Sequence, residues 1–244
     1  MTTKNVTYFR DIPDSIKQLT IKISDFKDPQ IQPDDILSIV IQTIDPQSSS
    51  TVNQPNAAPI GGTNTISGNA APTTLGYLID KNGIVSIPII GDVKLAGMST
   101  SQARDAIREK AEKYYISPNV QVRFANFKIT VIGEVMKPAT YTVPNERVSV
   151  LDAIGFAGDL SIYGKRENIL LIRDSVGAKQ FVRLNLNSSE LFKSPYFYLR
   201  QNDVIYVEPN EAKIATTDAA RTRTLAVMGS VISLLIVIAA RLLR

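Results

Sequence analysis

The sequence predicts an α+β protein, in which two small mixed-sheet modules are followed by a C-terminal transmembrane helix. Short runs of alternating apolar residues, which indicate strands, flank two helices that begin at Ser99 and Ser149. The two halves also share local patterns, since Ile87–Val93 matches Ile129–Val135. Finally, seventeen uncharged residues at 224–240 lie between basic residues near the C-terminus. Each observation bears on a different part of the architecture.

Composition excludes several classes of function. The 244 residues include no Cys, His or Trp. This excludes Ser–His–Asp and Cys–His nucleophiles, zinc sites with Cys or His ligands, haem and iron–sulfur centres. The net charge of +4 is concentrated near the C-terminus, so the nearly neutral body argues against nucleic-acid binding.

The polar start, Met1–Asn5, lacks the apolar stretch of a signal peptide. This indicates either a cytosolic tail-anchored chain or a mature form in which Met1 replaced the leader.

The first part of the chain comprises an N-terminal segment, 1–24, and a module at 25–126. In the segment, residues 6–9 and 19–23 alternate like short strands. Ile31–Ile41 is typical of a turn that enters a buried strand, and Leu75–Ile87 predicts a hairpin about Asp80–Gly83. The insertion at 45–74 is rich in Ser, Asn, Pro and Gly, which predicts a mobile or partner-ordered loop.

The first module also contains a helix. Ser99 and Gln102 form a capping-box pattern at its start. Its expected inner face is Ala103, Ala106, Ile107 and Tyr114, and Ser117–Pro118 is expected to end it. The next predicted strand buries Val120, Val122 and Phe124.

The second module is expected at 127–209, with 210–244 as the membrane region. Residues 128–135 and 141–143 predict strands, and Ser149 with Asp152 predicts a capped helix that Gly158 ends. Residues 168–173 and 180–184 predict a hairpin, and Asp203–Val207 a closing strand. The turn at 199–203 also resembles the turn at 31–35. Chance similarity between amphipathic strands remains the alternative to related modules, because the spacings differ.

Three groups of residues are candidates for binding or catalytic sites. Asp34 and Asp35 could be paired carboxylates, but turn residues before a strand are favoured strongly. The aromatic pairs Tyr114–Tyr115 and Tyr196–Tyr198 either stack on sugar rings or, as is favoured, pack in the core or between subunits. The cations Lys165, Arg166 and Arg173 either contact an anionic polymer or are solvated loop charges. No catalytic constellation, cofactor motif or metal-ligand cluster is found in the sequence.

The motifs carry a family resemblance. Ile31–Ile39, Leu78–Gly91 and Ser99–Ile107 resemble the polysaccharide biosynthesis/export domain. Residues from Ile129–Tyr141 to Asn202–Glu208 resemble the β-grasp domain called SLBB. The whole is similar to Wza-type outer-membrane polysaccharide export proteins, in the form typical of Bacteroidota.

The resemblance implies a non-enzymatic export component for capsular polysaccharide or exopolysaccharide. It implies an outer-membrane lipoprotein with periplasmic domains, a lipid at the position of Met1, and a homo-oligomeric ring whose C-terminal helices cross the outer membrane. It also implies an inner-membrane polysaccharide copolymerase as partner. Glycan contacts are expected at Tyr196, Tyr198 and Arg173. The alternatives are a membrane-tethered glycan-binding module that forms no conduit and, less favoured, a tail-anchored enzyme.

The C-terminal run fits a short membrane span. Its uncharged core, 225–240, is about 24 Å long as a helix, which suits a thin outer membrane. The predicted membrane-spanning residues are Leu225, Val227, Met228, Val231, Ile232, Leu234, Leu235, Ile236, Val237 and Ile238. The small residues expected to pack helix against helix are Ala226, Gly229, Ser230, Ser233 and Ala240. Its few polar residues leave open whether the helices enclose a water-filled pore.

Overall fold

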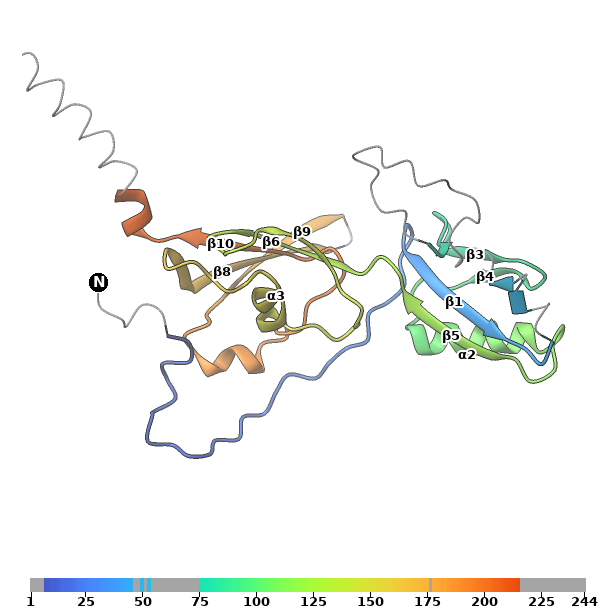
Figure 1. The fold of residues 1–244 in the computed structure, drawn as a ribbon, viewed down its shortest axis with the longest axis horizontal. Coiled ribbons are helices and arrows are strands. Elements are labelled where there is room, and N and C mark those ends of the chain that lie inside the picture. Colours follow the sequence, from blue (N-terminus) through green and yellow to red (C-terminus); the bar gives the residue numbers. More distant parts are fainter. Residues whose placement is uncertain (1–6, 46–48, 51, 54–74, 176, 216–244) are drawn as a thin grey trace, which may run out of the picture.

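The computed structural model describes residues 7–45, 49–50, 52–53, 75–175 and 177–215. These residues form two α+β units that follow one another along the long axis of the molecule (Figure 1). The α+β class predicted from the sequence is confirmed. In the described ranges no helix is both long and apolar enough to cross a membrane. The predicted membrane helix and its packing residues, 225–240, lie outside these ranges.

The first unit is built on a three-stranded antiparallel sheet of order β2-β1-β5. The strands are β1 (Ile36–Gln42), β2 (Tyr77–Leu78) and β5 (Asn119–Phe124). Alternate residues of β1 and β5 are buried, because one face of this sheet packs on the core. The helix α2 (Thr100–Ala111) starts with the predicted Ser99–Gln102 capping box and buries Ala103, Ile107 and Ala111.

The predicted hairpin at 75–87 is wrong in its pairing. Its turn exists, since the Asp80 carboxylate accepts hydrogen bonds from the backbone N–H groups of Asn82 and Ile84. However, β2 pairs with β1, while β3 (Ile84–Ile87) pairs with β4 (Gly91–Lys94). The turn therefore redirects the chain from one sheet to another. Tyr114 was also misplaced, because α2 ends three residues earlier and leaves its ring exposed.

Within the insertion at 45–74, the structure describes a few residues that pack against the first sheet. Val52 is completely buried, and the side chain of Asn53 pairs with both the N–H and the C=O of Ile41. Asn53 thus satisfies backbone groups of β1. The remainder of the insertion lies outside the described residues.

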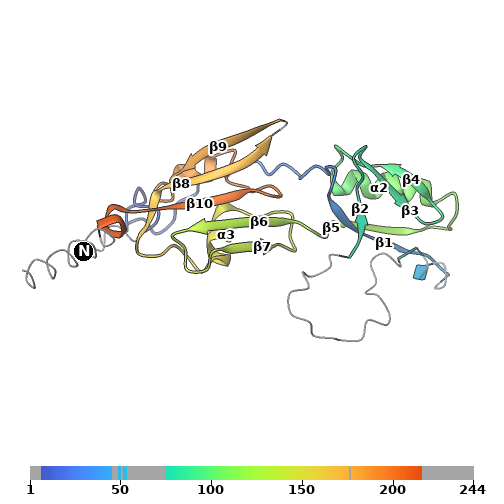
Figure 2. The same cartoon turned by 90° about the horizontal axis from the view of Figure 1, so that it is seen from above.

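The second unit holds a five-stranded sheet of order β7-β6-β10-β8-β9 (Figure 2). Its strands are β6 (Lys128–Gly133), β7 (Ala139–Thr142), β8 (Gly164–Ser175), β9 (Ala178–Leu184) and β10 (Val204–Pro209). β10 is central, parallel to β6 and antiparallel to β8. The helix α3 (Val150–Phe156) has the predicted Ser149–Asp152 capping box, and a short 3₁₀ helix, η3, spans Ser189–Lys193.

The N-terminal segment runs along the second unit before it enters the first (Figure 1). The backbone N–H groups of Phe9 and Arg10 donate to the carbonyls of Leu186 and Asn187. The Asp11 carboxylate accepts from the N–H of Ser189, the first residue of η3. The strand expected at 19–23 is wrong, because this stretch has no ladder partner and its alternating residues are largely exposed. We call residues 8–30 the strap.

Candidate functional site at the junction of the two units

The junction is organised by two turns with the same backbone geometry. In the first, Asp34 has a φ of 70°, and the Asp35 carboxylate accepts from the N–H of Gln32 at 2.8 Å. In the second, Asn202 has a φ of 64°, and the Asp203 carboxylate accepts from the N–H of Arg200 at 2.7 Å. Left-handed φ values favour Asp and Asn, which explains their presence at these positions. The likeness between the two stretches of sequence therefore has a structural basis at these turns.

The two turns contact each other. The side-chain amide of Gln201, in the second turn, donates to Asp35 at 2.8 Å and to the Asn126 side chain at 3.3 Å. Asn126 lies between the units and also accepts from the N–H of Ile36, at the start of β1. The turns that open β1 and β10 are therefore held together by side-chain amides at the point where the chain passes between units.

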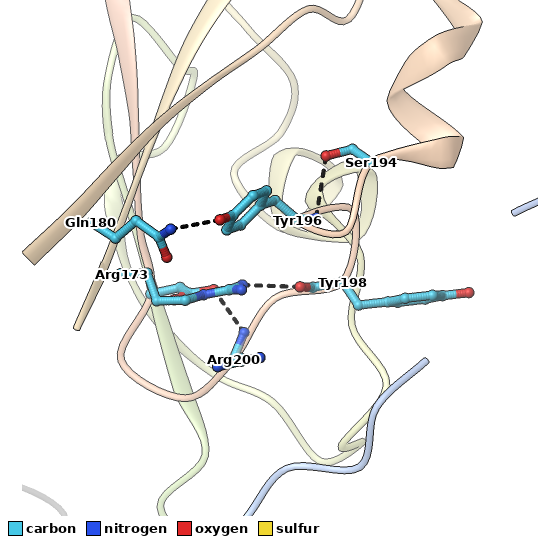
Figure 3. A network of polar contacts seen from close by, with 7 residues as sticks. Arg173, Gln180, Ser194, Tyr196, Tyr198 and Arg200 are labelled. Carbon is cyan, nitrogen blue, oxygen red and sulfur yellow. Dashed lines mark hydrogen bonds and ion pairs between the residues drawn. The ribbon is translucent and has the colours of Figure 1, made fainter. Parts of the chain in front are cut away.

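Asp203 forms a buried ion pair with Arg173, at the end of β8. The guanidinium donates to Asp203 at distances of 2.7 and 3.0 Å, and it also donates to the carbonyl of Tyr198 at 3.0 Å (Figure 3). The side chains of Arg173 and Asp203 are 5 % and 0 % exposed. Neither expectation for Arg173, a polymer contact or a solvated charge, matches this burial. Arg173 fixes the turn that carries Tyr198.

Asp35 is also buried, at 6 % exposed against 0 % for Asp203, but it has no arginine partner. Burial, which disfavours the charged carboxylate, raises the pKa of Asp35 to about 6. The hydrogen bonds from Gln32 and Gln201 oppose this rise, and the neighbouring Asp34 adds to it slightly. Asp34 itself is exposed, so the two carboxylates do not form a shared catalytic pair. They are turn residues, as the sequence favoured.

A cleft of about 310 Å³ opens between the strap and the second turn. The ring of Tyr196 lies over the Arg173 guanidinium at 5.4 Å, and its hydroxyl accepts from the Gln180 side chain (Figure 3). The residues that line the cleft are Ser24, Asp25, Lys27, Arg173, Gln180, Pro195, Tyr196, Tyr198, Leu199 and Arg200. The three predicted glycan contacts therefore converge on one cleft, although Arg173 lies beneath its surface.

Tyr198 forms the boundary of this cleft. Its ring points away from Tyr196 (Figure 3) and contacts the strap through an edge-to-face arrangement with Phe26, with ring centres 5.2 Å apart. Arg147 covers the same ring at 5.0 Å and donates to the Tyr198 hydroxyl. Phe26 also lines a larger hollow of about 560 Å³ beside Arg123 and Glu146. The strap thus contributes side chains to both hollows.

The surface of the cleft offers aromatic, amide and cationic groups. Lys27 and Arg200 are exposed, and the Gln180 amide lies beside the Tyr196 ring. Because the exposed Asp25 also lines the cleft, its charges are mixed, and such groups suit weak contacts with a polar chain. In the parts of the chain that the structure describes, no group of three or more acidic side chains is placed to hold a metal ion.

Several cleft residues were missed from sequence. Arg200 occupies the same place in the repeated turn as Gln32, and both side chains are exposed. Phe26 and Lys27 carried no signal, since the strap has neither helical nor strand periodicity. The other predicted aromatic pair, Tyr114–Tyr115, lies in the first unit after α2 and is separate from the cleft.

Comparison with known proteins assigns a family to each unit. Residues 24–125 match the model for polysaccharide biosynthesis/export proteins, and residues 127–207 match that for the SLBB domain. The EPS I polysaccharide export outer membrane protein EpsA of Ralstonia nicotianae is 26 % identical over 187 residues, which cover 72 % of this chain and 46 % of EpsA.

Two further relatives have similar names. The capsule polysaccharide export outer membrane protein CtrA of Neisseria meningitidis is 30 % identical over 116 residues, 45 % of this chain and 29 % of CtrA. The exopolysaccharide production protein ExoF of Rhizobium meliloti is 30 % identical over 89 residues, 34 % of this chain and 21 % of ExoF. The aligned part of this chain spans less than half the length of each. With both domain matches in order, the chain belongs to the polysaccharide biosynthesis/export family and carries an SLBB domain after its export domain.

Proposed function

We propose that this chain is a component of an outer-membrane polysaccharide export system, with its two units in the periplasm. The observation that carries the proposal is the ordered match of an export domain and an SLBB domain, together with relatives named as polysaccharide export outer membrane proteins. The role is a structural and guiding one, without catalysis. An inner-membrane copolymerase would supply the polymer.

The finer architecture belongs to the same proposal. Residues 225–243 cross the outer membrane as a helix of nearly 30 Å, and several copies form a ring around the polymer. The small residues at 226, 229, 230, 233 and 240 allow close helix contacts in that ring. The purified protein in detergent should then form a particle well above the 26.8 kDa of one chain. A strictly monomeric particle with its tail intact would contradict the ring.

The decisive experiment compares export by cells that carry the full chain with export by cells that carry a chain without residues 211–244. Surface polysaccharide should be lost with the truncated chain, while the purified truncated chain should retain any glycan binding. Normal export by the truncated chain would instead favour a tethered glycan-binding module. Periplasmic levels of both chains, measured by immunoblot, control for degradation.

The cleft at Tyr196 is the proposed place of glycan contact. Tyr196→Ala should weaken binding of the exported polymer roughly 3- to 10-fold, the equivalent of about 1 kcal/mol of lost ring contact. Tyr114→Ala, which removes an exposed tyrosine from the first unit, is the matched control. Equal weakening in both variants would remove the cleft from the proposal. The melting temperature of each variant separates lost contact from lost folding.

A further inference from the structure

The end of the second unit that lies away from the first exposes large apolar side chains on three neighbouring segments. Met136 follows β6, Ile162 precedes β8 and Ile214 follows β10, and they are 65 %, 59 % and 53 % exposed. In Figure 1, the start of β8 and the end of β10 lie at this end. We call the three residues and Tyr163 the apolar rim.

The rim segments are fixed to one another by hydrogen bonds. The backbone N–H of Asn210 donates to the Tyr163 carbonyl at 2.7 Å, and its side chain donates to the Ile162 carbonyl at 3.3 Å. The N–H of Met136 donates to Asp159, in the loop that leads to Ile162. Exposure of Met136, Ile162 and Ile214 is therefore maintained by a bonded scaffold.

Aromatic and basic groups accompany the apolar side chains. The Lys213 ammonium lies 5.2 Å from the centre of the Tyr163 ring and 3.4 Å from a Glu134 oxygen. Lys165 and Arg10 line a hollow of about 250 Å³ beside Asn210. The acidic groups Glu167 and Glu211 are also exposed here, so the end is mixed in charge. A tyrosine flanked by lysines and exposed aliphatic side chains is typical of the boundary between a bilayer and water.

The sequence shows what adjoins this rim. The uncharged run at 224–240 begins ten residues after Ile214, and Arg221 and Arg223 lie between them. A surface linked so closely to a membrane-spanning run is held near the bilayer. We propose that the apolar rim docks on the lipid surface, with Ile162 and Ile214 inserted among the headgroups and Lys165 and Lys213 beside lipid phosphates. This rests on the proposed membrane span of residues 225–243.

The absence of Trp from the chain provides a clean optical test. Single tryptophans are introduced by Ile162→Trp or Ile214→Trp in the full chain, reconstituted in vesicles whose lipids are brominated near the headgroup. Fluorescence at both positions should fall roughly twofold, because an indole at the interface lies close to those bromines. Leu78→Trp, in the first unit and 60 % exposed, is the matched control and should not be quenched.

A fourth variant, Leu234→Trp, distinguishes failure of this inference from failure of the proposed span. With lipids brominated deep in their chains, it should be quenched if residues 225–243 cross the bilayer. Quenching at 234 with none at 162 and 214 would overturn the docking alone, and those side chains would then face water or another copy. Quenching at 162 and 214 but not at 234 would support the docking and overturn the span. No quenching at any position would overturn both.

Discussion

The turns that open β1 and β10 differ in the charge that faces their buried aspartate. Both use a left-handed residue followed by an aspartate that accepts a backbone N–H. Asp203 is paired with a guanidinium, whereas Asp35 is met by the neutral amide of Gln201. The same kind of turn therefore places its aspartate in an ion pair in one unit and beside a neutral amide in the other. What surrounds a motif decides its electrostatics.

The largest expected loss of stability comes from a substitution at Asp203, in the turn that opens β10. Asp203→Asn keeps an acceptor for the Arg200 N–H but leaves the Arg173 guanidinium buried without a counter-ion. The free energy of unfolding should fall by about 3–5 kcal/mol, measured by urea denaturation at pH 7. Asp174→Asn removes a carboxylate from an exposed pair with Lys179 and should cost less than about 1 kcal/mol. Similar losses in the two variants would mean that the Arg173 pair is not buried.

The corresponding substitution in the turn that opens β1, Asp35→Asn, should instead raise the free energy of unfolding at neutral pH. The raised pKa of Asp35 means that the folded protein binds this proton more tightly than the unfolded chain does. The stabilisation that the folded protein gains from this protonation is therefore full below pH 4 and is lost as the pH rises through about 6. Asp35→Asn should remove this dependence and stabilise the protein at pH 7 by on the order of 2 kcal/mol. Melting temperatures at pH 4.5 and pH 7 measure it, and a parallel loss at both pH values would contradict it.

A smaller effect is expected from the amide that links the two turns. Gln201→Ala removes a hydrogen bond to Asp35 and should cost about 1 kcal/mol at pH 7. Because that bond favours the charged carboxylate, its loss should move the pKa of Asp35 further upward, which NMR titration of the carboxyl carbon detects. A downward shift would show that another group controls the charge of Asp35.

The smallest effect concerns the polar contact on the cleft side of Arg173. Tyr196→Phe keeps the ring over the guanidinium but removes the hydrogen bond with Gln180, which lies at the surface. The free energy of unfolding should change by about 0.5 kcal/mol or less. A loss above 2 kcal/mol in urea denaturation would show that the hydroxyl, more than the ring, holds the Arg173 turn.

Capping motifs and apolar alternation predicted the helix starts and strands well. They did not predict which segments, distant in the chain, pair with one another. The capping boxes at Ser99 and Ser149 and the alternation in β5 depend on neighbours within a few residues, so the sequence suffices for them. The pairing of β2 with β1 does not, because the Asp80 turn sets a direction without choosing a partner.

The junction illustrates the same limit. Arg173 follows Ile169 and Leu171 at period two, so its burial could have been predicted. Its partner lies thirty residues away, and nothing local identifies Asp203. The likeness of the two turns was visible in the sequence, but their contact through Gln201 depends on how the units meet.

The strap has a consequence for the order of folding. Asp11 is made early, yet the N–H that it binds belongs to Ser189, 178 residues later. The export domain, 24–125, is synthesised before any of these partners exist. Contacts of such sequence separation form slowly, because a long loop must close first. The strap can therefore attach only after the chain has been made as far as residue 189, well into the SLBB domain.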